Sequence, residues 1–116
     1  MVKSISKNEF NNLYTKKDDV LINKEGKDSI LKFTAVWCSP CKMLAPILNK
    51  LSEKYTDMPI YEIDVDEEYE LSAIFNIRSI PTMLFVSKSG KINQQIGALT
   101  EGQLEKFILK CFKSGE

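Results

Sequence analysis

A pair of cysteines separates two contrasting stretches of this sequence. Cys38-Ser39-Pro40-Cys41 follows an apolar run at 29–36 that reads as a strand, and apolar residues at helical spacing begin directly after it. A strand that leads into a helix through C-x-x-C is typical of a redox-active dithiol. Both sulfurs are then expected at a helix N-terminus, where free backbone N–H groups and the helix dipole favour a thiolate. The thiolate attacks disulfides, so the pattern predicts thiol–disulfide exchange.

Two other uses of the C-x-x-C pair remain open. It is half of a structural zinc site, but such a site needs four ligands and usually takes them from Cys and His. The chain has no histidine and one further cysteine, Cys111, so we expect no metal. A permanent structural disulfide is the other alternative, although closing so short a loop removes little entropy from the unfolded chain.

Cys111 itself is expected to be a core residue. It lies at helical spacing with Leu104, Phe107 and Ile108, and free cysteine buries readily. A regulatory thiol is the alternative interpretation of this residue.

Length and charge indicate one small domain and argue against several function classes. A chain of 116 residues with 43% hydrophobic content can bury one core, so we expect a single domain over residues 1–116. Sixteen basic and sixteen acidic side chains cancel, which gives no electrostatic reason to expect binding to nucleic acid or a membrane. No signal-peptide pattern or membrane-spanning run is present, so a cytoplasmic location is expected unless a leader has been removed.

Strand and helix patterns alternate along the chain. The expected strands are 2–5, 29–36, 59–65, 82–86 and 91–96, the last two joined in a hairpin that turns at Gly90. Helices are expected after the capping boxes Ser6–Glu9 and Thr100–Gln103, over 39–55, and from the acidic segment 64–68 to Phe75. Residues 16–29 receive no element. The order predicts an α/β fold with a central mixed sheet and helices on both faces.

Several motifs, taken in order, resemble the thioredoxin family. They are Trp37-Cys-Ser-Pro-Cys-Lys42, Ala45-Pro46, Ile80-Pro81-Thr82 and Gly97-Ala98, and the match covers about residues 29–112. The resemblance implies a thioredoxin fold and a protein-disulfide reductase whose only redox group is its own Cys38–Cys41 disulfide, with no other cofactor. It also implies oxidised proteins as substrates, a flavin-dependent thioredoxin reductase as partner, a monomeric state, and a role in electron transport and cell redox homeostasis.

The resemblance also assigns roles to the motif residues. Cys38 is expected to be the exposed attacking thiol and Cys41 the buried resolving thiol, in agreement with the position of Cys38 at the helix end. Trp37 resembles the family's active-site tryptophan, and Pro81 its cis-proline facing the disulfide. Cis geometry at this proline would leave residue 80 able to pair with an extended substrate backbone. The other expected substrate-binding residues are Ile80, Thr82, Gly97 and Ala98.

This sequence departs from the family at two expected interior positions. The family usually has an aspartate six residues before the first cysteine and a lysine on the neighbouring strand, whereas this chain has Lys32 and Glu62 there. A buried unpaired lysine is costly, so we expect a sign-reversed ion pair between them, unless both side chains reach water. Glu62 is then expected to be the base for Cys41, because a charged Lys32 cannot accept a proton. Ser39 and Thr34 also differ from the usual glycine and aromatic residue.

Two other functions stay open beside the reductase. A disulfide isomerase or oxidase is the nearest, although those relatives often carry a histidine between the cysteines and this chain has Ser39-Pro40. A non-enzymatic thioredoxin-like binding subunit is the second. Loss of one cysteine would favour it, and both are present.

Overall fold

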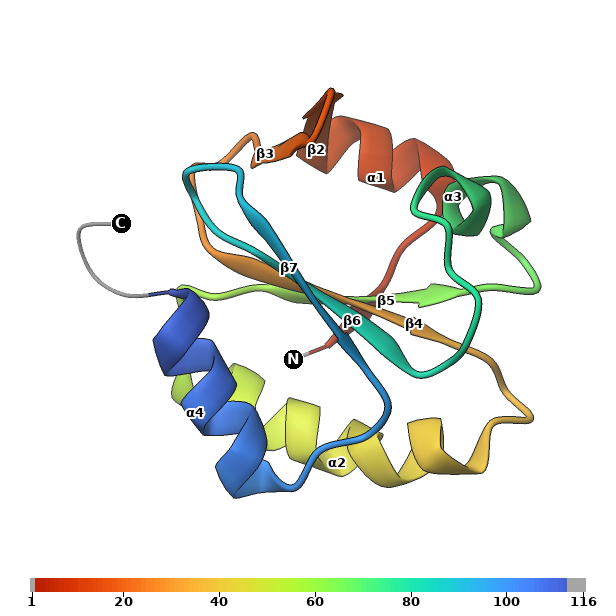
Figure 1. Cartoon of the computed structure of the whole chain (residues 1–116), viewed down its shortest axis with the longest axis vertical. Helices are drawn as coiled ribbons and strands as arrows, with labels where there is room; N and C mark the ends of the chain where they lie inside the picture. The colour runs from red at the N-terminus through yellow and green to blue at the C-terminus, as the bar shows by residue number, and fades with distance from the viewer. Residues whose placement is uncertain (1, 113–116) are drawn as a thin grey trace.

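The computed structural model describes residues 2–112, in which a central sheet lies between two layers of helices (Figure 1). The elements in chain order are β1 (Lys3–Ser4), α1 (Lys7–Leu13), β2 (Tyr14–Lys17), β3 (Val20–Asn23), β4 (Ser29–Thr34), α2 (Ser39–Lys54), β5 (Ile60–Asp64), α3 (Tyr69–Ile74), β6 (Thr82–Val86), β7 (Ile92–Ile96) and α4 (Glu101–Cys111). Within these residues no helix is long and apolar enough to cross a membrane.

The main sheet has the order β1-β5-β4-β6-β7. β1, β5 and β4 run parallel, while β6 and β7 are antiparallel to their neighbours. Helices α1 and α3 cover one face, and α2 and α4 cover the other (Figure 1). The expected α/β class with a mixed sheet flanked on both faces is therefore confirmed.

Alternation along β4 directs its side chains to two separate cores. Leu31 and Phe33 pack in the cluster under α1 and α3, whereas Ile30 packs in the cluster under α2 and α4. Since successive side chains of a strand point to opposite faces, Lys32 and Thr34 share the α2 face with Ile30. All six residues of β4 are buried, so Lys32 is a charged residue inside the protein.

Both predicted capping boxes are present. Ser6 and Glu9 exchange side-chain and backbone hydrogen bonds at the start of α1, and Thr100 and Gln103 do the same at the start of α4. Each pair satisfies two backbone donors that a helix start would otherwise leave free.

The segment without a predicted element forms a second small sheet. β2 and β3 pair antiparallel from Tyr14 opposite Asn23 to Lys17 opposite Val20. The hairpin has a weak sequence signal, because one strand is mostly polar and the turn holds Asp18 at φ 54° instead of glycine. Its Leu21 is fully buried, and the Leu21 N–H donates to the carbonyl of Gly90. Long-range packing thus determines this element.

Gly90 gives a test of that packing. It has a φ of +99°, and an added Cβ would lie 2.6 Å from the Ile22 Cδ1 and even closer to Val20. We expect Gly90→Ala to lower the free energy of unfolding by about 1–3 kcal/mol. Gly102→Ala is the matched control. Gly102 lies in α4, and a Cβ added there would meet nothing within 4 Å. Urea unfolding of both variants checks this, and equal stability of the two would contradict it.

Candidate active site

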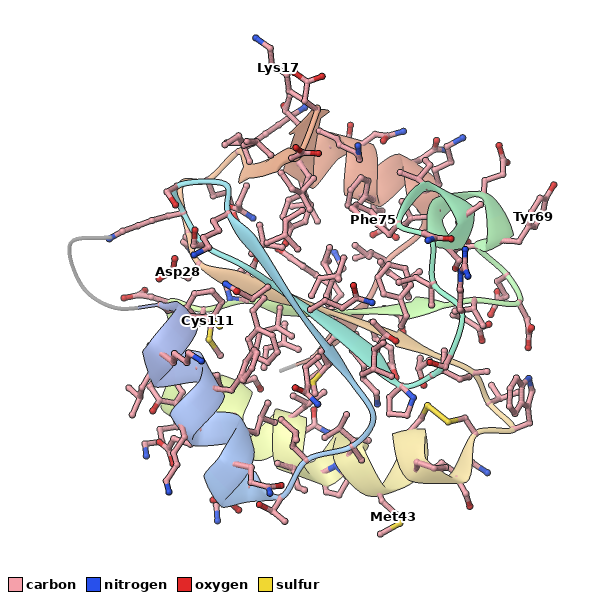
Figure 2. The ribbon with its side chains drawn as sticks, in the orientation of Figure 1. Lys17, Asp28, Met43, Tyr69, Phe75 and Cys111 are labelled. Atoms are coloured by element: carbon pink, nitrogen blue, oxygen red, sulfur yellow. A yellow bond between two sulfur atoms is a disulfide. The ribbon has the colours of Figure 1, made fainter. Side chains whose placement is uncertain are left out.

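Cys38 and Cys41 form a disulfide at the start of α2, with their Cα atoms 5.3 Å apart (Figure 2). Ala35, Val65 and Ile80 pack around it. In this disulfide form Cys38 is only 4% exposed and Cys41 only 1%. The solvent exposure expected for Cys38 is therefore not seen in this disulfide form.

The sulfur of Cys38 lies at the N-terminus of α2 and accepts a backbone hydrogen bond there. Cys38 is the N-cap residue of α2, and its Sγ accepts a hydrogen bond of 3.2 Å from the Cys41 N–H. That N–H is one of the donors that the first turn of a helix cannot use internally. A donor held against Sγ stabilises a negative charge there, as does the helix dipole. The geometry favours a thiolate at Cys38.

Lys32 and Glu62 face each other across the pairing of β4 with β5, where their Cα atoms are in register. The Lys32 Nζ lies 3.6 Å from the Glu62 Oε1, which confirms the expected ion pair. Lys32 is 2% exposed and Glu62 31%, so the ammonium is the inner partner and the carboxylate the outer one. Burial lowers the pKa of Lys32, and the charge of Glu62 opposes that shift.

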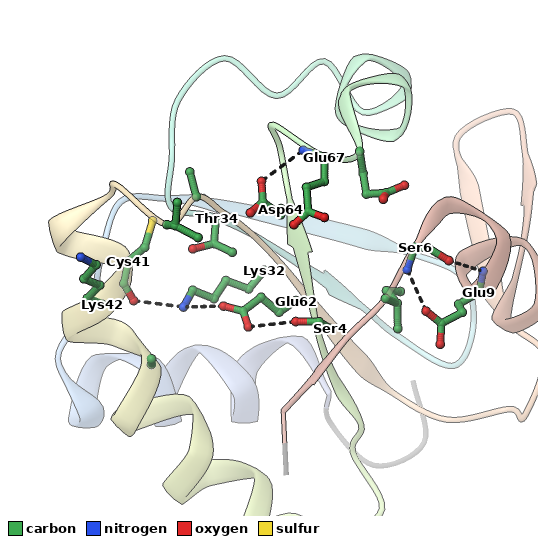
Figure 3. A pocket seen from close by; sticks show the side chains of 15 residues that line it. Ser4, Ser6, Glu9, Lys32, Thr34, Cys41, Lys42, Glu62, Asp64 and Glu67 are labelled. Carbon is green, nitrogen blue, oxygen red and sulfur yellow. Dashed lines mark hydrogen bonds and ion pairs between the residues drawn. The ribbon is translucent and has the colours of Figure 1, made fainter.

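The same ammonium also reaches the start of α2. Its Nζ donates a 3.0 Å hydrogen bond to the carbonyl oxygen of Cys41, and Ser4 Oγ donates to the Glu62 Oε2 at 3.5 Å. Figure 3 shows the amine of Lys32 between the Cys41 carbonyl and the Glu62 carboxylate. Lys32 thus connects the pair of strands β4 and β5 to Cys41, the second cysteine of the C-x-x-C motif.

A solvent-accessible hollow of about 480 Å³ opens beside this pair, between the carboxyl ends of β4 and β5 and the first turns of α2 (Figure 3). The residues that line it include Lys32, Thr34, Ala35, Cys41 and Glu62. Four acidic residues also line it, namely Glu9, Asp64, Glu67 and Glu68. This arrangement connects the surroundings of the buried cysteine with solvent.

Trp37 lies beside the disulfide and is 65% exposed. Its indole Nε1 donates a 2.8 Å hydrogen bond to the Asp66 Oδ2. Asp66 belongs to the acidic segment 64–68, whose composition predicts a helix start and whose spacing gives no indication of a contact with Trp37. Val36, also next to the motif, is 75% exposed, so an apolar surface borders the cysteines.

The peptide bond between Ile80 and Pro81 is cis. Ile80 packs against the disulfide cluster, and the carbonyl of Pro81 accepts a 2.8 Å hydrogen bond from the N–H of Gly97. The structure therefore brings the motifs at 80–82 and 97–98 together beside the cysteines. Ala98 is exposed.

Thr82 differs from the other expected substrate-binding residues. It is 1% exposed, and its hydroxyl donates to the Ser79 carbonyl at 2.6 Å. Its side chain supports the cis-proline turn from beneath and does not reach the surface. Ile96, which pairs with Thr82 across the sheet, is by contrast an apolar residue that is 58% exposed.

Met43 in α2 is 73% exposed and points outward in Figure 2. Cys111 is free, half-buried and packed against the core cluster between the sheet and helices α2 and α4, and burial raises the pKa of its thiol.

Among residues 2–112 no group of His, Cys, Asp and Glu side chains is arranged to hold a metal ion.

Comparison with known proteins gives a consistent result. The thioredoxin family model matches residues 2–110. A thioredoxin from Borreliella burgdorferi is 40% identical over 87 residues, which are 74% of this chain and 74% of that protein. Thioredoxin H5 from Oryza sativa subsp. japonica is 38% identical over 86 residues, 74% of this chain but 64% of the rice protein.

Solved structures agree with these sequence matches. A chain described in a crystal-structure study of chloroplastic thioredoxin z superimposes with a TM-score of 0.81 at 26% identity. The superposition covers 95% of this chain and 93% of that one.

Proposed function

This chain belongs to the thioredoxin family and reduces disulfides by dithiol–disulfide exchange, and we propose that Cys38 is its nucleophile and Cys41 its resolving thiol. The observation that carries this assignment is the hydrogen bond from the Cys41 N–H to the Cys38 Sγ at the N-terminus of α2. It stabilises a thiolate on the first cysteine only. Cys38 attacks a substrate disulfide to form a mixed disulfide, and Cys41 then displaces the reduced substrate.

Glu62 is the base for the resolving step in this proposal. Cys41 must lose a proton before it attacks, in a site where it is 1% exposed. Lys32 is charged and paired, so it has no free position for that proton, whereas the carboxylate of Glu62 lies beyond it on the solvent side. Lys32 supports the step electrostatically, because a positive charge next to Cys41 favours its thiolate.

The apolar rim around the disulfide is the proposed substrate-docking surface. It consists of Trp37, Ile80, Pro81, Gly97 and Ala98, extended by Val36 and Ile96. Ile80 packs against the disulfide cluster, and an extended substrate segment that reaches the disulfide is proposed to pair with the backbone of residue 80. The buried side chain of Thr82 takes no part in that contact.

The proposed cellular setting is supported by the family and by the chemistry. Oxidised proteins are the proposed substrates, and a thioredoxin reductase is the proposed source of electrons. We propose that the chain acts as a monomeric single domain in the cytoplasm, in electron transport and redox homeostasis, with no cofactor besides its disulfide. Neither nucleic acid nor a membrane is a proposed partner, since the charges of the chain balance. The reduction potential of Cys38–Cys41 against glutathione tests the reducing direction, and a potential above that of glutathione would favour an oxidase or isomerase.

Replacement of Glu62 tests the proposed base. With a chromogenic aromatic disulfide, the attack by Cys38 and the displacement by Cys41 each release one coloured thiolate, so stopped-flow absorbance separates the two steps. We expect Glu62→Gln to slow the second release about 100-fold and to leave the first within about twofold, because general-base catalysis is lost only in the second. Glu101→Gln, at an exposed carboxylate paired with Lys50, is the matched control and should change neither. A wild-type second phase in Glu62→Gln would refute the assignment.

A further inference from the structure

A second pocket lies at the end of the molecule far from the disulfide. It has a volume of about 140 Å³ and lies between the turn that joins β6 to β7 and the last turns of α4. Cys111 is one of the residues that line it, and Figure 2 shows Cys111 on the opposite side of the molecule from the disulfide. The proposed reaction of Cys38 and Cys41 makes no use of this pocket.

The hydroxyl, amide and ammonium side chains that line this pocket can all donate hydrogen bonds. They are Ser87, Ser89, Lys91, Asn93 and Lys110. Of the residues that the structure describes, no aspartate or glutamate lines the pocket. Within residues 2–112 neither Lys91 nor Lys110 forms an ion pair. The pocket therefore combines several donors with positive charge that no neighbouring carboxylate in this part of the chain compensates.

Ser87 is the buried donor of this set. It is 6% exposed, and its Oγ lies 2.6 Å from the Oγ of Ser89. Each hydroxyl has one hydrogen and their mutual bond uses only one of the two, so the pair can donate one more hydrogen bond. Among residues 2–112 no acceptor takes it. A donor that is left without an acceptor at a buried position is costly, and a bound anion would supply that acceptor.

The walls of the pocket hold these donors in place. The N–H of Ser87 donates a 2.9 Å hydrogen bond to the carbonyl of Lys91, which fixes the ends of the turn. Phe107 supplies an apolar wall, and its ring centre lies 4.6 Å from that of Phe85 in the core. The donors are therefore positioned before a ligand arrives.

Cys111 adds a thiol to the same pocket. Burial raises the pKa of this thiol, and the charges of Lys110 and Lys91 oppose that shift, so both ammonium groups lie near the sulfur. The chain has three cysteines, and two of them form the disulfide. In the oxidised protein Cys111 is therefore the single free thiol, and its reactivity reports on what occupies the pocket.

We propose that this pocket binds a phosphate group. A phosphate group carries about two negative charges near pH 7 and several acceptor oxygens, which match two ammonium groups and three neutral donors. Charge-assisted hydrogen bonds of this kind are the strong ones, and lysine is a usual partner of phosphate. The volume of about 140 Å³ is well below the roughly 300–1,000 Å³ of sites for drug-sized ligands, so a single small group fits inside.

Alkylation of Cys111 in the oxidised protein tests the site, with inorganic phosphate as the probe. We expect saturating phosphate to slow the reaction of Cys111 with iodoacetamide about 10-fold, because the anion occupies the space beside the sulfur and disfavours its thiolate. Sodium chloride at the same ionic strength should leave the rate within about twofold, because it only screens charge. Glycerol phosphate carries the same group on a small molecule. Tighter protection by the ester identifies a phosphorylated small molecule as the ligand, and tighter protection by inorganic phosphate identifies the free ion.

Variants of the lining residues separate a site from a general effect of salt. Lys91→Gln, Lys110→Gln and Ser87→Ala should each raise the phosphate concentration for half-maximal protection at least about 10-fold, because each removes a hydrogen bond to a charged group. Lys106→Gln, at an exposed position of α4 outside the pocket, is the matched control and should leave that concentration unchanged.

An NMR titration gives a second readout that does not depend on the thiol. The backbone amide signals of Ser87 and Lys91 should shift with the half-maximal phosphate concentration found by alkylation, and that of Cys38 should not shift. Equal effects of phosphate and chloride would overturn the site, as would wild-type protection in both lysine variants. Disulfide reduction plays no part in these measurements, so their failure would leave the proposed reductase function untouched.

Discussion

Cys41→Ser is expected to stop after its first chemical step and to accumulate as a mixed disulfide with its substrate. Cys38→Ser is expected to form no such adduct and to reduce no disulfide above the uncatalysed rate. These are the largest effects that we expect in this chain, because each variant removes one of the two sulfurs that carry the electrons.

The local geometry explains why the two variants differ. The Cys38 sulfur accepts the Cys41 N–H at the helix N-cap, so it has a stabilised thiolate in the reduced form. The Cys41 sulfur lies within the first turn and is the more deeply buried of the two. We therefore expect an incoming disulfide to react with Cys38 first.

Mass spectrometry of each variant after exposure to an oxidised protein checks the expectation, together with alkylation rates at neutral pH. Cys111 is the internal control, because burial raises the pKa of its thiol and it should alkylate slowly in every variant. Adducts that form through Cys41 in Cys38→Ser, or faster alkylation of Cys41 than of Cys38, would reverse the proposed roles.

The sequence predicted the parts of the fold that local patterns determine. The caps at Ser6 and Thr100 depend on residues three positions apart, and the apolar run that forms β4 is typical of a strand covered on both faces. The hairpin of β2 and β3 escaped prediction, because its stability depends on the burial of Leu21 and the close approach of Gly90. Both of these are long-range contacts.

The candidate site shows the same division. Cys38, Cys41 and Pro81 belong to motifs, and the resemblance to a family with opposite charges at these two strand positions indicated the pair of Lys32 with Glu62, which the structure confirms. Contacts for which neither a motif nor the family resemblance gave a signal were not predicted. The bond from Trp37 to Asp66 spans 29 positions, and the bond from Lys32 to the Cys41 carbonyl depends on how α2 packs against the sheet.

The reversed ion pair is the feature whose replacement should most affect stability. Lys32→Glu would place two carboxylates side by side, one of them in the 2% exposed position of Lys32, and would remove the donor to the Cys41 carbonyl. We expect a loss of about 3–5 kcal/mol, which is a large fraction of the stability of a small domain. Adding Glu62→Lys should recover much of it by restoring opposite charges.

A double-mutant cycle isolates the interaction between the two side chains from the loss of the carbonyl donor. Urea unfolding of Lys32→Glu, Glu62→Lys and the double variant should give a coupling energy of about 2–4 kcal/mol. This value is low for a buried ion pair, because the Glu62 side chain is 31% exposed to solvent. The same exchange at Lys50 and Glu101, an exposed pair at 3.1 Å, should give about 0.2–1 kcal/mol. Equal coupling in the two cycles would show that solvent compensates the Lys32 charge in spite of its burial. A larger coupling energy for Lys32 and Glu62 than for Lys50 and Glu101 would show that Glu62 stabilises the buried ammonium that lies against the Cys41 carbonyl.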